Sequence, residues 1–403
     1  MFDLNVLDGE AELRPLSSEE RAQKIWLVEE LERSFLQEEI SWNQKSRALW
    51  LQEGDKNTKF FHRITNSHRR YNSISSLMIN GVLSTDKETI STGITQFYQD
   101  LYQEGGSRRP MLDGLEFSMI STEDSDWLGR PFEEEEVLGV IQGFNGDKAP
   151  GPNGLSMAFF QACWAVVHLD IMALLRAFHV SGSFEKSLNA TFLALIPKKV
   201  EAVKVKEFRP FSLVSGLYKI LAKKLANRLR WLVLPKIIST SQNAFVRGRQ
   251  ILDSVLIASE CLDSRLKRGK PGVLCKLDVE KAYDHVNWEF PHYLFRIYGF
   301  SQLWTSWIRF CISTVRFSIL INGSPSGFFA SSRGLRQRDP LSPLLFVIVM
   351  ETLSRIMDRA IRGGLFSSFM VGSPQDHQVW ISNLLFANDT LIFCDADLIK
   401  LEH

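Results

Sequence analysis

Two short apolar segments that end beside carboxylates constrain the fold most. Residues 272–278 read GVLCKLD, which predicts a buried strand that ends at Asp278. Residues 383–393 read NLLFANDTLIF, which predicts a hairpin with Asn388 and Asp389 at its turn. A lone buried carboxylate is costly, so Asp278 should be paired, protonated or bound to a cation.

The two segments together predict a phosphoryl-transfer site. Strands that place carboxylates side by side hold hard divalent cations through oxygen ligands. Paired cations of this kind activate an attacking oxygen and stabilise a leaving one. Either acid alone could be structural, but both together, with the basic segment described below, indicate a polymerase.

The surrounding pattern predicts an α+β fold with helices on one side of a sheet. Residues 272–288 suggest a strand that runs into a helix, and 334–357 a loop followed by a buried helix. A second hairpin is predicted at 315–330, because Val315, Phe317, Ile319 and Ile321 alternate before an Asn322-Gly323 turn.

The N-terminal part reads as mainly helical. A long helix should follow Pro15, with Ser17 and Glu20 at capping-box spacing. Its apolar stripe is formed by Val28, Leu31 and Phe35. A short hairpin should turn at Asn80-Gly81. Residues 107–117 and the acids at 133–136 suggest a linker.

Residues 53–74 alternate cations with aromatic rings. These residues are Lys56, Lys59, Phe60, Phe61, His62, Arg63, Arg69, Arg70 and Tyr71. Such a segment can neutralise phosphates and stack on bases. It can equally be an amphipathic helix with Phe60 and Phe61 in the core, and the spacing favours this second interpretation.

Residues 198–236 are a stronger indication of a polyanionic partner. They hold eleven Lys and Arg against two acids, in a chain whose net charge is only +1. A solvated helix face usually mixes both signs, so this excess favours nucleic acid.

The remaining composition indicates a soluble intracellular protein, without distinguishing nucleus from cytoplasm. The five cysteines are scattered and never spaced as CxxC, which favours buried thiols in a reducing compartment. The N-terminus lacks the features of a signal peptide, and no apolar run is expected to span a bilayer.

Seven motifs in order resemble the reverse transcriptase of plant LINE-type non-LTR retrotransposons. They read DKAPGPNGLSMAFF, LIPKK, EFRPFSLVSGLYKILAKKLANRL, SQNAFVRGRQILD, LDVEKAYDHVNW, RGLRQRDPLSPLLF and LLFANDTLIF. The resemblance begins near Ser41. It implies a right-hand polymerase with fingers and an incomplete palm, preceded by a helical region, and with the thumb absent. The implied divisions are 1–125 (helical linker region), 126–272 (fingers-like) and 273–403 (palm-like, truncated).

The resemblance also implies a catalytic centre. Asp278 and Asn388 would bind Mg²⁺ together with the Val279 carbonyl, and Asp389 would complete the catalytic tip. Tyr283 would favour deoxynucleotides by screening the sugar 2′ position.

Further residues would contact the substrates, which are an RNA template, a DNA primer and dNTPs. Lys198 or Lys199 and Arg209 would meet the triphosphate, while Gln337 would position template and nucleotide. The cations expected to hold nucleic acid are Lys223, Lys224, Arg228 and Arg230. The oligomeric state is not implied.

Three positions depart from the family pattern. Asn388 replaces the first Asp of FADD, Arg338 the Gly of QGDP, and Asn153 the Asp of APGPDG. An amide offers no charge to a cation, so a lost metal ligand should reduce the rate about a thousandfold or more. All three changes are reachable by single G-to-A changes in the usual codons, which suggests decay; other nucleotide changes there would contradict this hypothesis.

Two functions therefore stand. The first is an RNA-directed DNA polymerase, impaired in this chain. The second is a non-catalytic nucleic-acid-binding relic of a retrotransposon. Primer extension distinguishes them.

Overall fold

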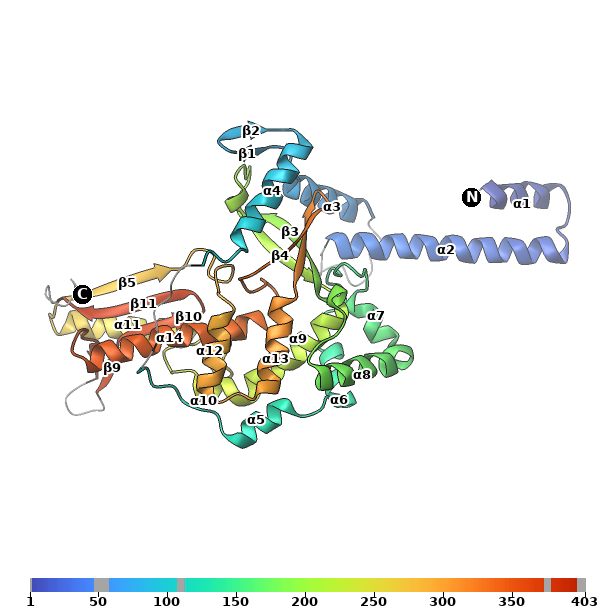
Figure 1. Cartoon of the computed structure of the whole chain (residues 1–403). Helices are drawn as coiled ribbons and strands as arrows, with labels where there is room; N and C mark the ends of the chain where they lie inside the picture. Colours follow the sequence, from blue (N-terminus) through green and yellow to red (C-terminus); the bar gives the residue numbers. More distant parts are fainter. Residues whose placement is uncertain (1, 47–57, 107–111, 113, 373–377, 397–403) are drawn as a thin grey trace. The chain divides into compact units, whose positions relative to one another are not determined.

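The computed structural model describes residues 2–46, 58–106, 112, 114–372 and 378–396. The chain forms two compact units, Met1–Ile74 and Ser75–His403, which are coloured along the sequence in Figure 1. Each unit is described separately. The predicted divisions at 125 and 272 stay a prediction.

The first unit is helical. Its helices are α1 (Phe2–Leu13), α2 (Ser18–Ser46) and α3 (Thr58–Asn72). The predicted capping box is confirmed, because Glu20 N donates to Ser17 Oγ (3.2 Å) and Ser17 N to Glu20 Oε2 (2.8 Å). The expected stripe is not buried within this unit, since Val28 and Phe35 are exposed.

The segment with alternating cations and rings is partly described. It lies largely in α3, where Arg63, Arg69 and Arg70 are exposed to solvent. Lys56 lies outside the described residues, as do the side chains of Lys59, Phe60 and Phe61. Its predicted role therefore stays a prediction.

The second unit mixes helices and strands, as the α+β prediction requires. Its helices are α4 (Lys87–Leu101), α5 (Thr122–Gly129), α6 (Glu134–Gln142), α7 (Met157–Ala162), α8 (Trp164–Ser181), α9 (Gly216–Arg228), α10 (Leu234–Ile237), α11 (Ile251–Lys267), α12 (Glu289–Tyr298), α13 (Gln302–Ser313) and α14 (Ser342–Arg362). A π-helical turn, η4 (Leu229–Val233), joins α9 to α10.

The strands of this unit form two main sheets. The strands are β1 (Leu77–Ile79), β2 (Val82–Ser84), β3 (Ala190–Pro197), β4 (Phe208–Val214), β5 (Gly272–Asp278), β6 (Arg316–Ile321), β7 (Ser324–Ala330), β8 (Phe369–Val371), β9 (Val379–Ile381), β10 (Asn383–Phe386) and β11 (Asp389–Asp395). One sheet has the order β4-β3-β6-β7 and the other β10-β11-β5, while β1-β2 and β8-β9 pair separately.

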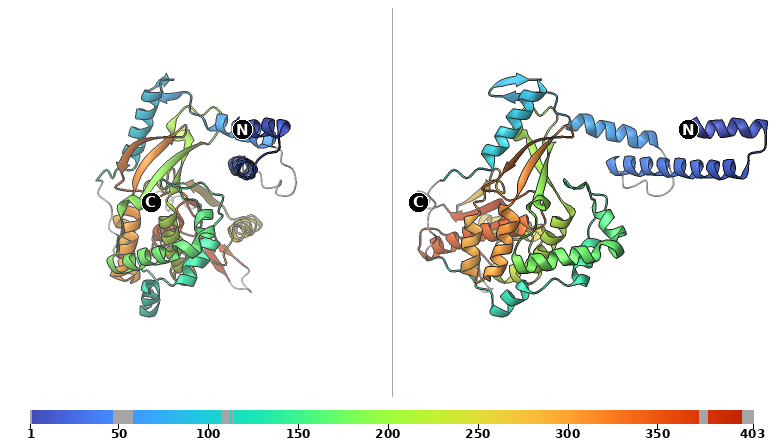
Figure 2. Two further views of the ribbon diagram at one scale, coloured as in Figure 1. Left: turned by 90° about the vertical axis from the view of Figure 1, so that its right-hand side faces the viewer. Right: turned by 45° about the vertical axis from the view of Figure 1, so that its right-hand side comes forward.

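The expectation of one sheet is therefore wrong. The β6-β7 hairpin joins β3 in parallel, with Leu193 opposite Ile319, instead of joining the carboxylate strands. Alternating side chains determine which face of a strand is buried, but they do not determine which edge it pairs with. In Figure 2, α12 and α13 gather below the four-stranded sheet, and α4 lies along its side.

Both Asn-Gly turns are confirmed. Asn80 and Gly81 have φ of 51° and 85°, and Asn322 and Gly323 have φ of 52° and 89°. Two successive residues with positive φ match the twist of the flanking strands, which is why Asn-Gly is favoured there.

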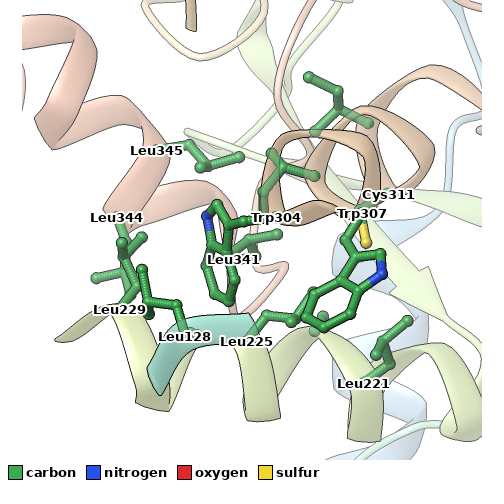
Figure 3. Close-up of a cluster of buried hydrophobic side chains, with 14 of the residues drawn as sticks. Leu128, Leu221, Leu225, Leu229, Trp304, Trp307, Cys311, Leu341, Leu344 and Leu345 are labelled. Carbon is green, nitrogen blue, oxygen red and sulfur yellow. The ribbon is translucent and has the colours of Figure 1, made fainter. Parts of the chain in front are cut away.

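The predicted buried helix is also confirmed. Residues Leu344 and Leu345 of α14 are fully buried, as are Trp304 and Trp307 of α13. Figure 3 shows Trp304 and Trp307 above leucines of α9, with Cys311 beside Trp307. All five cysteines are free, and Cys261, Cys311 and Cys394 are buried as expected.

Two local expectations are wrong. Residues 133–136 belong mostly to α6, whose Val137 and Ile141 are buried, and so they are not a linker. No helix follows β5 directly, because residues 279–288 form turns before α12. Those turns bond to a distant loop, with Gly334 N donating to Val286 O and Leu335 N to Tyr283 O.

Among the described residues, α8 alone is long and apolar enough by composition to cross a membrane. The expectation that no apolar run is long enough to span a bilayer therefore needs correction for α8. Core helices of soluble proteins pass the same test, and the side chains of Ile171, Met172, Leu175 and Phe178 on α8 are buried inside the unit.

Candidate functional site

The two carboxylate segments lie side by side, as predicted, but the expected burial of the first one is wrong. Leu274, Leu277 and Asp278 of β5 are exposed, because no element of the described chain covers that part of the strand. Strands β5 and β11 pair antiparallel with Asp278 directly opposite Asp389, so both side chains lie on one face. Asn388 stands in the β10-β11 turn, and its Nδ2 donates to Asp278 Oδ1 at 2.9 Å. The amide therefore presents a donor to the neighbouring acid, where a carboxylate would present an acceptor.

A buried glutamine that the sequence analysis missed supports this turn. The side chain of Gln242 is fully buried, and its Oε1 accepts from Ala387 N and Ala244 N, both at 3.0 Å. Ala387 has a positive φ of 56°, which a non-glycine residue adopts only when its surroundings hold it. The SQNAF motif was the available signal for this contact.

The donor set fits a divalent cation only in part. Asp278 and Asp389 offer two carboxylates, with the Val279 backbone next in sequence. Within the described ranges, no group of three or more His, Cys, Asp or Glu side chains could hold a metal ion. Because Asn388 is turned toward Asp278 as a donor, the set falls short of a two-cation centre.

A pocket of about 170 Å³ brings together three residues predicted to bind the nucleotide. Lys198, Arg209 and Gln337 all line it. The other lining residues include Phe97, Tyr98, Lys206, Glu280, Lys281 and Asp284. Four cations thus surround a space that also contains two acids, and Glu280 lies two residues after Asp278.

Two other predicted residues have different surroundings. Lys199 Nζ pairs with Glu207 Oε1 at 2.9 Å, which favours Lys198 as the pocket cation. Tyr283 stacks on Phe346 of α14, with ring centroids 4.4 Å apart, and is not among the residues that line the pocket.

The loop that carries Gln337 is fixed on both sides by a buried ion pair. Arg336 Nη2 lies 2.8 Å from Asp339 Oδ2, and both side chains are almost fully buried. Arg336 also donates to Asn189 Oδ1 (2.6 Å) and to Cys311 O (3.0 Å). This anchoring holds the loop in which Gln337 lines the pocket.

Arg338 occupies a backbone shape that suits glycine. Its φ is 67°, a region that side chains with a Cβ atom enter at a cost of about 1 kcal/mol. Its guanidinium lies over the Phe211 ring at 3.6 Å from the centroid. By contrast, Asn153 can replace an aspartate without loss of its turn hydrogen bond, because its Oδ1 accepts from Leu155 N as an aspartate would.

Asp284 is a buried acid that the sequence analysis did not single out. Its carboxylate accepts from Tyr102 Oη at 3.1 Å and from Gln337 Nε2 at 3.2 Å. Burial raises its pKa from 3.8 to about 6, while the Gln337 and Tyr102 hydrogen bonds and two lysines oppose this rise.

The nucleic-acid prediction needs correction at Lys224 and Arg228. Both side chains are buried and contact Glu136 of α6. Arg228 also donates to Leu128 O (2.8 Å) and Pro131 O (2.8 Å). These two cations face the core side of α9, where no phosphate can reach them.

Three other cations lie on another face of the same helical run. Lys219, Lys223 and Arg230 are half-buried and form no ion pair with any residue that the structure describes. Burial lowers the pKa of Lys223, and the charge of Arg230 lowers it further. A polyanion would relieve that repulsion.

The sequence of the chain is similar to those of known proteins. Residues 196–402 match the family model described as "Reverse transcriptase (RNA-dependent DNA polymerase)". The chain is 27% identical over 363 residues to "Transposon TX1 uncharacterized 149 kDa protein" of Xenopus laevis, which covers 89% of this chain and 27% of that protein.

Two further relatives are similar over shorter stretches. The Pol polyprotein of the type-2 retrotransposable element R2DM of Drosophila melanogaster is 28% identical over 217 residues, 53% of this chain and 20% of that protein. The uncharacterized mitochondrial protein AtMg01250 of Arabidopsis thaliana is 45% identical over 71 residues, 18% of this chain and 56% of that protein. The chain thus spans about a quarter or less of the TX1 and R2DM proteins.

Removing the acid that compensates the buried cations should destabilise the second unit. Glu136→Gln leaves Lys224 and Arg228 uncompensated, so the free energy of unfolding should fall by about 3 kcal/mol or more. Chemical denaturation measures this loss. Glu134→Gln, an exposed acid on the same helix, is the matched control and should change stability by less than about 0.5 kcal/mol. Equal effects of the two variants would contradict the burial argument.

Replacing the buried acid should produce a pH-dependent gain in stability. A carboxylate whose pKa is higher in the folded than in the unfolded state costs stability as pH rises through that window, here from 3.8 to about 6. Asp284→Asn should therefore gain stability over the parent by up to about 3 kcal/mol between about pH 4 and pH 7. Denaturation at both pH values tests this, and a difference that does not change with pH would refute it.

Proposed function

Because this chain belongs to the reverse transcriptase (RNA-dependent DNA polymerase) family, we propose that residues 126–403 act as fingers and palm of an RNA-directed DNA polymerase. The similarity to retrotransposon Pol polyproteins supports a non-LTR element as its origin. The quoted motifs and the Arabidopsis relative support the plant LINE type. The partners would be an RNA template, a DNA primer and dNTPs.

The pocket that Glu280 and Lys281 line just after β5 carries this proposal. Lys198 and Arg209 would hold a triphosphate there through charge-assisted hydrogen bonds, and Gln337 would orient the nucleotide.

Asp278, the Val279 carbonyl and the residue at position 388 would hold Mg²⁺, which would supply activation of the attacking oxygen; Asn388 holds it weakly because an amide carries no charge. Free cysteines support a reducing, intracellular setting.

We propose that polymerisation by this chain is strongly reduced. Asn388 brings no negative charge to the site and uses its amide hydrogens on Asp278. Arg338 is a second obstacle. It belongs to the loop that should position the nucleotide, and its long side chain lies over the Phe211 ring of β4.

Primer extension on an RNA template tests the proposal. We expect the parent and Asn388→Asp to extend poorly, because Arg338 remains in both. Asn388→Asp combined with Arg338→Gly should exceed the parent by about a thousandfold or more, because the charged ligand is recovered and the loop obstacle is removed together. Adding Asp278→Ala to that double variant is the control and should abolish extension. Parent activity equal to that of the double variant would refute impairment.

A non-catalytic role in nucleic-acid binding is the second candidate. The observation that favours it is the half-buried row of Lys219, Lys223 and Arg230, which lacks acidic partners within the described chain. Such cations can hold a phosphate backbone without any chemistry.

Salt-dependent binding to single-stranded RNA checks this role. Lys223→Gln with Arg230→Gln should weaken binding and reduce the slope of log K against log salt by about 1.4. Lys267→Gln removes a cation that is paired with Asp263, and it should change neither quantity appreciably. Binding by the parent that does not respond to salt would exclude phosphate contact.

A further inference from the structure

The carboxylate of Asp284 is the strongest unexplained feature of the second unit. Its side chain is 2% exposed, yet no ion pair compensates it among the residues that the structure describes. Two neutral donors serve it instead: the hydroxyl of Tyr102 and the side-chain amide of Gln337. A buried carboxylate held in this way is an acceptor that orients its donors.

Tyr102 reaches this acid from outside the residues that match the family model. It follows α4, and its backbone oxygen accepts from Ser332 N (2.9 Å) and Arg333 N (3.2 Å). Its ring stacks on Phe317, with centroids 5.0 Å apart. The end of α4 is therefore fixed against the loop that leads to Gln337.

Gly334 allows this close packing. It has φ of 93°, and a Cβ atom there would lie 2.9 Å from Asp284 O and 3.0 Å from the Tyr102 ring. Chain segments around residues 102, 284 and 334 thus meet at one point without space for another side chain.

Gln337 connects this point to the pocket. Its backbone oxygen accepts from Ser212 N at 3.3 Å, and its Nε2 donates to Asp284. With the amide nitrogen committed, Oε1 is the side-chain atom left to accept from a ligand in the pocket that Lys198 and Arg209 also line.

We propose that Asp284 and Tyr102 are positioning residues for the nucleotide, because together they fix which end of the Gln337 amide faces the pocket. This inference rests on the proposed function, since it assumes that the pocket holds a dNTP. A protonated Asp284 would donate to Gln337 Oε1 and so turn the amide round.

Several titratable groups face Asp284 and modulate this arrangement. Tyr98 and Tyr102 approach from the α4 side, Lys281 from its own segment, and Lys198 from the end of β3. Both lysines favour the ionised acid, as do the two hydrogen bonds. Loss of the Tyr102 hydroxyl should therefore favour protonation at a higher pH.

Calorimetric titration of the full chain with dATP in Mg²⁺ tests the proposal. Asp284→Asn should weaken binding about tenfold, because a neutral amide accepts more weakly than a carboxylate and its NH₂ group would favour the turned Gln337 amide. Tyr102→Phe should weaken it about fivefold. Tyr298→Phe removes the hydroxyl of another buried tyrosine, which has no hydrogen-bond partner, and serves as the matched control with unchanged affinity.

A pH profile separates positioning from a general structural effect. The ratio of parent to Asp284→Asn affinity cancels protonation of the nucleotide itself. It should fall toward one as the pH drops through about 6, because the parent acid is then protonated. In Tyr102→Phe, the loss of affinity on acidification should begin at a higher pH.

The outcomes are distinct. Failure of the parent to bind dATP would overturn the proposed nucleotide pocket and this inference with it. Binding by the parent that Asp284→Asn and Tyr102→Phe leave unchanged would overturn the inference alone. A constant affinity ratio across pH would assign Asp284 a structural role only and would also refute the proposal.

Discussion

The buried guanidinium of Arg336 holds together the parts of the second unit on which the site depends. It pairs with Asp339, donates to Asn189 just before β3 and to Cys311 in α13, and lies over the Tyr218 ring of α9 at 3.9 Å. A buried cation without these partners would be strongly destabilising, so its environment is specified on every side. This ion pair fixes the conformation of the loop between Arg336 and Asp339. The fixed loop in turn orients the Gln337 side chain toward Asp284.

Local features of the fold could be predicted from the sequence, whereas long-range pairing could not. Asn-Gly turns and the alternation around Phe317 are encoded by neighbouring residues. The adjacency of Asp278 and Asp389 was predicted from the cost of a buried isolated acid, but both residues are exposed, so that argument does not explain the pairing. The partner of β6 depends on a strand more than a hundred residues away. The contact between Tyr102 and Asp284 likewise carries no sequence signal, because each residue looks ordinary in its own segment.

In the basic segment 198–236, the number of cations alone does not show which of them can bind a polyanion. Its cations separate into groups with different tasks. Lys224 and Arg228 neutralise Glu136 in the interior, and Lys236 Nζ lies 2.6 Å from Asp124. Lys198 and Arg209 line the pocket, while Lys223 and Arg230 remain half-buried on a separate face. A one-sided run of charge indicated a polyanion, but part of that charge serves folding alone.

The hydrogen bond from Asn388 to Asp278 has an evolutionary consequence. An aspartate at position 388 would repel the Asp278 carboxylate in the absence of a cation. Cation binding would then stabilise the hairpin. The amide replaces that repulsion with an attraction that is internal to the chain. A lineage released from the need to copy itself would therefore meet no folding penalty at this position. The hairpin thus has an internal contact at this point that does not depend on a bound cation.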